Sequence, residues 1–486
     1  MTRRRVCIAS LVLTAFLAGT AWAGQAPGSA AQPDVPITHR DRVYAAEQFS
    51  NTVSVTDPVS NTLLGVIRLG DPEPANLSPL YKGQLLVHGM GFSPDHHTLA
   101  VVAIGSNAVV FIDTETNTVK HITYVGRSPH EAFFTPDGRE VWVTVRGENY
   151  LSVLDAATFA ETGRITVPNG PGMTIFSPDG EYGYACSSFT PEIEVISVAD
   201  HQIVGKVAQA SPFCPNIAAT PDGAQVWLTL KDTGKVEVFD ARPPFKVLAT
   251  FDTGPITNHV NIVRNANGQF AYVTIGGLNV VKVFRTDTFA QVATIPVGDL
   301  PHGIWPSGDG ARVYVGLEGA DKVVTIDTLT DTVIATSPIG QGAQALTYVP
   351  QAVRDGANAQ NLQPLGLAGA VAHLWLASPG AMRGEPPTSV ALFDQGLTQM
   401  LEAAVTGLEA KTPYVLALAE HADGSGARTP FAAFTTNPAG AAIVNAIGPI
   451  RQVVQDGSAT GRRYLVITRT EAGKSGSPVQ VQFQRQ

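Results

Sequence analysis

The sequence predicts an all-β protein in which a seven-bladed β-propeller precedes a small β-sandwich domain. Three observations support this fold class: a turn motif that recurs along the chain, short strand-like segments between its copies, and a change of composition near residue 351. The motif recurs about every 40 to 45 residues, which is the length of one four-stranded propeller blade. Both domains are therefore expected to consist of short strands and tight turns.

The recurring motif is a Pro-Asp-Gly turn that follows an apolar segment. Its clearest copies occupy residues 134–138, 176–180 and 219–223, and weaker copies occupy residues 92–95, 264–268 and 306–310. Glycine suits such a turn because it accepts positive φ angles at which a side chain would clash. Between the turns, segments such as Val236-Glu-Val-Phe239 alternate β-branched or aromatic residues with polar ones, which favours strands over helices.

The strand pattern predicts seven blades that both ends of the chain close. The innermost strands, which precede the turns, start near His88, His130, Gly172, Pro215, Val260, His302 and Gln344. The outer strands begin near Arg42, Thr98, Glu140, Tyr182, Gln225, Phe270 and Arg312. Because the chain enters on an outer strand and leaves on an inner one, residues 343–350 are expected to complete blade 1 with residues 42–69. This closure hides two sheet edges that would otherwise pair with other chains.

Several of these segments share a family pattern. Tyr272-Val-Thr274, Val141-Trp-Val-Thr144, residues 109–119 and residues 295–303 resemble the YVTN-type β-propeller repeat of exported microbial proteins. The resemblance covers residues 42–350 and departs from the family at Ile275, where the family has asparagine. It implies a propeller fold and a surface or periplasmic binding role.

Residues 351–363 have the composition of a linker, and residues 364–470 are expected to form the β-sandwich. Residues 405–418 and 431–436 resemble the later strands of a fibronectin type III domain. That resemblance implies that Tyr414 is a corner tyrosine, with its ring in the core and its hydroxyl on nearby backbone. Residues 353–486 lack the His/Cys/Met pattern of a copper-binding cupredoxin, and residues 471–486 are predicted to be a flexible tail.

The first 23 residues have the pattern of a secretory signal. Three arginines at positions 3–5 precede an apolar stretch over residues 6–19 and a cleavage site at Ala21-Trp-Ala23. Cleavage near Ala23 leaves an N-terminal extension, residues 24–41, and predicts a periplasmic or secreted protein without a membrane span. The alternative is an uncleaved N-terminal anchor helix.

The charge of the chain bears on its partners. The formal net charge is −9, and removal of the three signal arginines changes it to −9 − 3 = −12. A nucleic-acid partner is therefore not expected, because a polyanion would meet net repulsion without a basic stripe to offset it.

A set of histidines is the candidate site. His88, His130 and His302 occupy the same place, four residues before the start of the turn motif, with Gln344 as their counterpart in blade 1. His259 is predicted to sit one residue earlier than this place in blade 6. Inner strands run side by side around the channel, so these side chains are expected to converge at its mouth. Imidazoles from neighbouring strands suit Cu, Zn or Fe, while Ca is a further candidate ion.

Three further residues extend the predicted ring. Met173 and Cys214 would complete the circle, and their sulfurs would favour copper. Glu131 is expected to be a ligand or an acceptor for an imidazole N–H. The competing interpretation treats the histidines as solvated remnants of the repeat. A site for an anionic or other polar ligand is a further alternative.

The two cysteines that follow the signal segment, Cys186 and Cys214, are expected to lie in adjacent blades on the face that carries the histidines. An even pair in an exported protein predicts a disulfide, with thiol ligation of a metal as the alternative. An insertion at residues 71–86 and the loop residues Arg146, Lys231 and Glu318 belong to the same face, here called the top face.

These features favour an exported, non-catalytic binding or scaffold protein that uses the top face to bind a protein or a small polar ligand. Nucleophile, phosphate-binding and c-type haem motifs are absent from the sequence. The alternative function is a metal-dependent enzyme of lactonase or lyase type, or a copper or haem redox protein, that uses the histidine ring.

Overall fold

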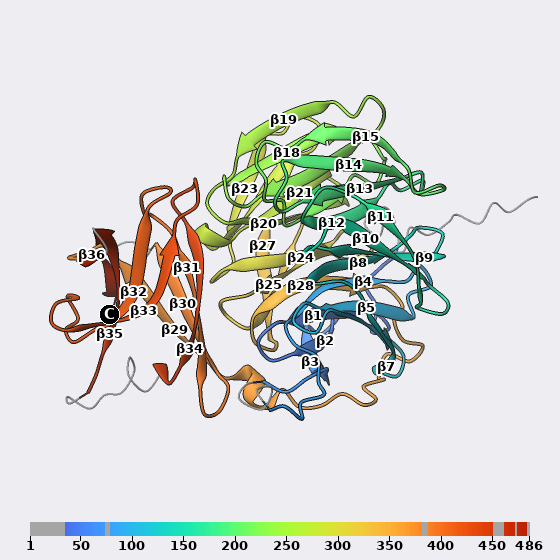
Figure 1. Ribbon diagram of the computed structural model, residues 1–486. Helices are drawn as coiled ribbons and strands as arrows, with labels where there is room; N and C mark the ends of the chain where they lie inside the picture. Colours follow the sequence, from blue (N-terminus) through green and yellow to red (C-terminus); the bar gives the residue numbers. More distant parts are fainter. Residues whose placement is uncertain (1–34, 73–77, 382–386, 451–460, 472–473, 484–486) are drawn as a thin grey trace, which may run out of the picture.

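The computed structural model describes residues 35–72, 78–381, 387–450, 461–471 and 474–483. Two β domains lie side by side, the propeller in blue to yellow and the C-terminal domain in orange to red (Figure 1). Apart from the single helical residue Ile450, the helical residues in these ranges form the short 3-10 turns η3 (Gly276–Leu278) and η4 (Gly366–Gly369), so the all-β prediction is confirmed. No helix in the described part of the chain is long and apolar enough to cross a membrane. The predicted signal segment and its cleavage site lie outside the described residues.

The propeller has seven four-stranded antiparallel blades, as predicted. The inner strands of blades 1 to 7 are β28 (Ala343–Val349), β4 (Val87–Phe92), β8 (Pro129–Phe134), β12 (Pro171–Phe176), β16 (Ile217–Ala219), β20 (Thr257–Asn265) and β24 (Pro301–Pro306). The second strands are β1 (Arg42–Glu47), β5 (Thr98–Ala103), β9 (Glu140–Val145), β13 (Tyr182–Ser187), β17 (Gln225–Leu230), β21 (Gly268–Ile275) and β25 (Arg312–Leu317).

The two outer strands of each blade follow in chain order. The third strands are β2 (Thr52–Asp57), β6 (Ala108–Asp113), β10 (Tyr150–Asp155), β14 (Glu192–Ser197), β18 (Lys235–Asp240), β22 (Val280–Arg285) and β26 (Lys322–Asp327). The fourth strands are β3 (Thr62–Arg68), β7 (Thr118–Tyr124), β11 (Glu161–Thr166), β15 (Ile203–Ala208), β19 (Val247–Asp252), β23 (Gln291–Pro296) and β27 (Thr332–Pro338).

Both ends of the propeller meet in blade 1. Strand β28 pairs antiparallel with β1, with Arg42 opposite Val349. The Tyr348 hydroxyl donates to Asp41 at 2.6 Å, which ties the end of the last strand to the start of the first. The predicted closure is confirmed, and it removes the free edges that the first and last strands would otherwise present.

The turn motif owes its shape to its side chains. In the copy that follows β8, the Thr135 hydroxyl donates to Asp137 at 2.6 Å and accepts the Glu140 N–H at 3.1 Å. Gly138 has a φ of 70°, which glycine adopts without strain. These contacts fix the hairpin between the inner and second strands of the blade.

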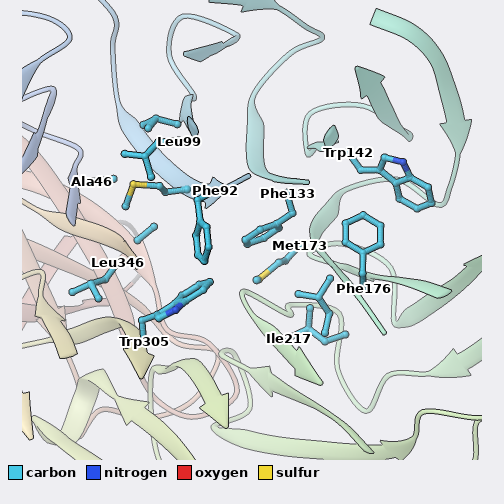
Figure 2. Close-up of a cluster of buried hydrophobic side chains, with 14 of the residues drawn as sticks. Ala46, Phe92, Leu99, Phe133, Trp142, Met173, Phe176, Ile217, Trp305 and Leu346 are labelled. Atoms are coloured by element: carbon cyan, nitrogen blue, oxygen red, sulfur yellow. The ribbon is translucent and has the colours of Figure 1, made fainter. Parts of the chain in front are cut away.

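The central channel below the top face is filled by apolar side chains. The inner strands direct these residues toward one another (Figure 2), and all are buried: Phe92, Phe133, Met173, Ile217, Trp305 and Leu346. The ring centroids of Phe92 and Trp305 are 6.1 Å apart. Only a void of about 20 Å³ remains between these side chains. We call this group of six residues the channel plug.

The C-terminal domain is a single eight-stranded sheet. Its strand order is β33 (Arg428–Thr435), β32 (Pro413–Ala419), β35 (Tyr464–Glu471), β36 (Lys474–Phe483), β29 (Val371–Ala377), β30 (Thr388–Asp394), β31 (Gln399–Val405) and β34 (Ala442–Gly448). The terminal strands β33 and β34 contact each other, so the sheet nearly closes like a barrel. The Tyr414 ring is buried and its hydroxyl accepts the Glu409 N–H at 3.3 Å, as expected of a corner tyrosine.

The predicted flexible tail is wrong for residues 474–483. They form β36, which pairs with β35 on one side and β29 on the other. The alternating segment Val479-Gln-Val-Gln-Phe483 is typical of a strand, and Gln480 is buried with its side chain bonded to Thr388 and Thr406. A polar residue with partners on neighbouring strands is stable inside the sheet.

The predicted linker is ordered along blades 1 and 2. The buried Arg42 guanidinium donates to the carbonyls of Gly356 and Asn358 at 3.0 and 2.9 Å. Gln363 and Val66 exchange two backbone hydrogen bonds of 2.8 and 2.9 Å. The segment is therefore anchored to the propeller before the chain enters the second domain.

The second domain packs on the top face of the propeller. On one side, Ile256 and Leu300 pack with the C-terminal residues Ala404 and Ala441 in one buried cluster. On the other side, a second cluster joins the two domains, and its Phe49 and Phe393 rings are 5.0 Å apart. Gln341 donates to Ala370 and Asp394 carbonyls at 3.0 and 2.8 Å, and Gln395 donates to the Phe49 carbonyl at 2.8 Å.

Candidate functional site

The histidines lie on β-bulges at the start of the inner strands. In blade 2, Val87 pairs with Ala103 and Met90 with Val101, so that His88 and Gly89 together face a single partner residue. The same irregularity surrounds His130 in blade 3 and His302 in blade 7, and Gln344 is the extra residue in blade 1. A bulge turns the strand locally and redirects its side chains. The same bulged position therefore recurs at the start of the inner strand in blades 1, 2, 3 and 7.

The predicted position of His259, one residue before the place shared by the other histidines, is wrong because the strand register of blade 6 differs. In blade 6, Thr257 pairs with Ile275 and Val260 with Val273, which places Asn258 at the shared position and His259 one residue after it. Strands β20 and β21 remain paired as far as Asn265 and Gly268, so the turn of this blade is displaced along the strand. Counting back from the turn motif therefore misplaced this histidine.

The structure brings all four imidazoles together in a row. The centroids of His130 and His88 are 4.5 Å apart, those of His88 and His302 are 6.5 Å apart, and those of His302 and His259 are 4.7 Å apart. Each side chain is buried, with at most 9% of its surface exposed. Positions that are two blades apart thus remain close enough to contact one another at the mouth.

Three of the rings are oriented through their Nδ1 atoms. Nδ1 of His130 lies 2.8 Å from the carbonyl oxygen of Gly172, and Nδ1 of His302 lies 2.7 Å from a Glu318 oxygen. Nδ1 of His88 lies 3.1 Å from Oε1 of Gln48. A carbonyl or carboxylate oxygen only accepts, so the hydrogen of each neutral ring resides on Nδ1. Each Nε2 then presents its lone pair to the site.

This orientation creates an unsatisfied contact. Nε2 of His88 and Nε2 of His130 are 3.0 Å apart, and in this protonation state both are acceptors. Two nitrogen ligands about 2.0–2.1 Å from one metal ion lie roughly 2.9 Å from each other at the 90° angle of octahedral or square-planar ions, and roughly 3.3 Å at the tetrahedral angle of zinc. A cation between the two rings removes the repulsion and fits their separation.

A proton is poorly suited to that position. Burial lowers the pKa of both imidazoles well below the ordinary histidine value, and nearby cationic groups, with Arg146 common to both, lower it further. Glu131, whose carboxylate accepts the Met90 N–H at 3.2 Å, lies next to the pair. One donor atom from each of His88, His130 and Glu131 falls within 4.8 Å of the others. Burial raises the pKa of the Glu131 carboxyl to about 8 in the absence of a cation.

The predicted sulfur ligands are wrong. Cys214 forms a disulfide with Cys186, with their Cα atoms 6.0 Å apart, so neither offers a thiolate to a metal. The sulfur of Met173 accepts a hydrogen bond from Asn216 at 3.2 Å and lines the void in the channel plug. The disulfide itself is the one predicted between blades 4 and 5. The remaining donors at the mouth are nitrogen and oxygen, and the sulfur argument for copper no longer applies.

A chamber of about 510 Å³ lies above the histidines, between the propeller and the C-terminal domain. The propeller contributes His88, His130, His302, Gln48, Gln344, Glu318, Arg146, Lys231, Asp232, Phe213, Pro215 and Ile256. The C-terminal domain contributes Glu402, Thr435, Asn437, Ala441, Ala442, Ile443 and Asn445. The domain thus covers the channel mouth. Part of the inserted loop on this face, residues 73–77, lies outside the described residues.

Glu318 organises the acidic side of the chamber. Burial opposes ionisation of its carboxyl, but the neighbouring His302 and Lys231 and the Gln344 amide, which donates at 2.6 Å, lower its pKa below the ordinary value. Glu402 reaches it from the C-terminal domain, and burial together with the Glu318 charge raises the pKa of Glu402 well above its ordinary value. The opposite directions of these two pKa shifts favour a proton on Glu402 and a negative charge on Glu318 across the domain interface.

Sequence reasoning missed the C-terminal half of this chamber. Glu402 lies on a strand with no motif around it, and the apolar residues 441–443 resemble any strand start. The docking of one domain on another leaves no local signal in either of them. Gln48 was also missed, although it directly follows β1, the second strand of blade 1.

Comparison with known proteins gives the fold but not a family. No family model matches the chain, and no curated protein matches it. Among solved structures, the chain is similar to a functionally unknown protein from Desulfotomaculum acetoxidans, with a TM-score of 0.53 and 16% identity over 63% of this chain and 97% of that one. It is also similar to hydrazine synthase from Kuenenia stuttgartiensis, with a TM-score of 0.49 and 20% identity over 56% of this chain and 92% of that one.

Proposed function

We propose that the protein is a metal-binding protein that holds one divalent first-row transition-metal ion at the channel mouth, between His88, His130 and Glu131. The 3.0 Å approach of the two Nε2 atoms carries this proposal, because both atoms are acceptors when their Nδ1 atoms donate outward. Outward hydrogen bonds of this kind fix the tautomer of metal-ligating histidines. A cation between them resolves the contact.

The donor set indicates the kind of ion. Imidazole nitrogens with one carboxylate suit zinc, copper or iron, whereas calcium takes oxygen ligands almost exclusively. Burial keeps the imidazoles neutral, which leaves their lone pairs available for a metal. Calcium, one of the ions that the sequence leaves open, is thereby disfavoured.

A different arrangement of Gln48 explains the contact without a metal. If the Gln48 amide is turned over, its nitrogen donates to Nδ1 of His88, and Nε2 of His88 then carries the hydrogen and donates to His130. In that case the pair forms an ordinary buried hydrogen bond. Metal analysis separates the two arrangements.

The test uses full-length mature protein purified without a His tag, dialysed, and equilibrated separately with Zn, Cu, Fe and Ca. We expect about one equivalent of a transition metal per chain and no retained calcium. The variant H88A/H130A should lose the metal, and His121→Ala, which removes an exposed histidine from β7, should keep it. Substoichiometric metal in the unmodified protein, or equal binding by H88A/H130A, would contradict the proposal.

We also infer that the protein works outside the cytoplasm. The basic and apolar pattern of residues 1–23 suggests export, and the Cys186–Cys214 disulfide supports an oxidising compartment. The YVTN-type repeats belong to the same proposal, and the buried Tyr414 ring supports the fibronectin-like assignment of the second domain. N-terminal sequencing of the protein from the exported fraction should give a chain that starts at Gly24. A chain that retains Met1 would contradict export by cleavage.

A further inference from the structure

Two cations in the chamber are not among the proposed metal ligands. Arg146 follows β9 and is held by two aromatic rings, with its guanidinium carbon 5.6 Å from the Phe189 centroid and 5.0 Å from the Phe213 centroid. Its guanidinium donates to no described residue, and its Nε atom is buried without a partner. Stacking between rings fixes the plane of a guanidinium and leaves its edge free to donate.

Lys231 is the second cation whose donors have no hydrogen-bond partner among the described residues. It follows β17, lines the same chamber, and its ammonium group forms no hydrogen bond or ion pair with a described residue. Glu318 receives its hydrogen bonds from His302 and Gln344, and burial raises the pKa of Glu402 well above its ordinary value. Asp232 bonds to Asn437 of the C-terminal domain. Asp232 offsets part of the charge of Arg146, and Glu318 and Asp232 offset part of the charge of Lys231, but neither cation donates a hydrogen bond to a carboxyl group of a described residue.

Part of the remaining wall is apolar. Phe213, Ile256, Ala442 and Ile443 line the chamber together with polar side chains such as Gln48, Thr435 and Asn445, and its volume of about 510 Å³ exceeds the need of a bare inorganic oxyanion. Ligand pockets for small organic molecules combine such apolar walls with a few polar anchors. Arginine binds carboxylates through paired hydrogen bonds, and lysine adds a compact positive charge.

We propose that the chamber binds a small organic carboxylate, with its carboxylate on Arg146 and Lys231 and its apolar body against the Phe213 and Ile256 side. This site shares the chamber with the proposed metal site but uses other residues. It goes beyond the metal proposal, and it can be measured in metal-free protein. A failure of metal binding and a failure of carboxylate binding are thereby separate results.

Calorimetric titration of full-length, metal-free protein tests this inference with three probes: benzoate, its neutral counterpart benzyl alcohol, and inorganic phosphate. We expect benzoate to bind, and both other probes to bind at least tenfold more weakly. The variants Arg146→Met and Lys231→Met should each weaken benzoate binding at least tenfold. The exposed Arg127 and the half-buried Lys235, neither of which lines the chamber, supply the controls, since Arg127→Met and Lys235→Met should leave it unchanged.

Two results would overturn the inference. One is the absence of benzoate binding, or equal affinity in Arg146→Met and the unmodified protein. The other is phosphate binding as tight as benzoate binding, which would assign the cations to an inorganic oxyanion instead. Circular dichroism of each variant establishes that the fold is retained, and the more conservative Arg146→Lys, which keeps the charge but loses the paired donors, should fall between the unmodified protein and Arg146→Met.

Discussion

The mouth of the propeller channel and the channel beneath it are built by the same inner strands but have opposite character. The mouth holds four buried imidazoles and a polar chamber of about 510 Å³, whereas the plug below it leaves about 20 Å³ unfilled. Buried polar groups cost free energy unless they are paired, while a filled apolar channel stabilises the fold. The plug therefore accounts for the stability of the ring, and the mouth is explained better by a ligand.

The largest expected effect is a loss of stability from the plug without a loss of metal. Trp305 is buried against Phe92, and Trp305→Ala should lower the free energy of unfolding by about 3–5 kcal/mol because it leaves a cavity. Chemical denaturation measures this change, and metal analysis of the folded variant should still give about one equivalent. If Trp305→Ala keeps its stability, or loses its metal while it is still folded, the channel plug and the channel mouth do not have separate roles in stability and metal binding.

The disulfide offers the next test, since it lies at the mouth on the side without histidines. Replacing both cysteines in C186A/C214A should lower the free energy of unfolding by about 2–4 kcal/mol, because the bond restricts the unfolded chain. Metal content should be unchanged, since neither sulfur is available as a thiolate. Lost metal in a folded double variant would restore the sulfur-ligand prediction.

Gln48 tests the orientation of His88 with a smaller effect. Gln48→Leu removes the acceptor at Nδ1 and should weaken metal binding by about 10- to 100-fold. Gln48→Glu keeps an acceptor and should retain the affinity or increase it. Competition with a chromophoric chelator gives both values. Equal affinity in the two variants would show that Gln48 does not orient the ring.

Glu47 is a buried carboxyl beside the mouth that serves structure alone. It accepts from Thr52 and Ser54, and burial raises its pKa from 4.5 to about 8. The folded state thus favours its protonated form, so its stabilising contribution is complete below about pH 4.5 and is lost as the pH rises toward 8. Asp321, whose pKa is raised by burial and by the Glu47 charge, has the same sign, so Glu47→Gln removes the Glu47 contribution together with the part of the Asp321 shift that Glu47 causes.

The stability of Glu47→Gln relative to the unmodified protein should accordingly rise with pH across this window, by up to about 1.4 kcal/mol for each pH unit. Below the window the two proteins should differ little. Urea denaturation at a series of pH values measures the difference. A difference that does not vary with pH would mean that Glu47 is ionised in the folded protein, and it would place a second charged group beside the mouth.

The repeat made the propeller predictable from the sequence, because each blade restates the same turn and strand pattern. Closure by residues 343–349 followed from counting inner and outer strands, and the shared position of His88, His130 and His302 followed from the turn spacing. His259 escaped this count because one hairpin extends farther. The bulges that turn the imidazoles inward depend on strand register, which the repeat alone does not specify.

The other half of the site could not be predicted because it depends on domain docking. Glu402 and the apolar roof at residues 441–443 reach the mouth only because the C-terminal sheet packs on the top face. The strand at residues 474–483 was missed although its alternation is visible in the sequence, since the preceding Gly and Ser residues resemble a tail. Local patterns predict elements, while contacts between domains depend on surfaces assembled from distant residues.

Anomalous diffraction from crystals of the metal-loaded protein, recorded above and below the absorption edge of the bound metal, tests the central claim most directly. We expect one anomalous peak at the channel mouth, about 2.0–2.2 Å from Nε2 of His88 and from Nε2 of His130, with a Glu131 oxygen in the same coordination sphere. A mouth without an anomalous peak, with the Gln48 amide nitrogen directed at His88, would contradict it.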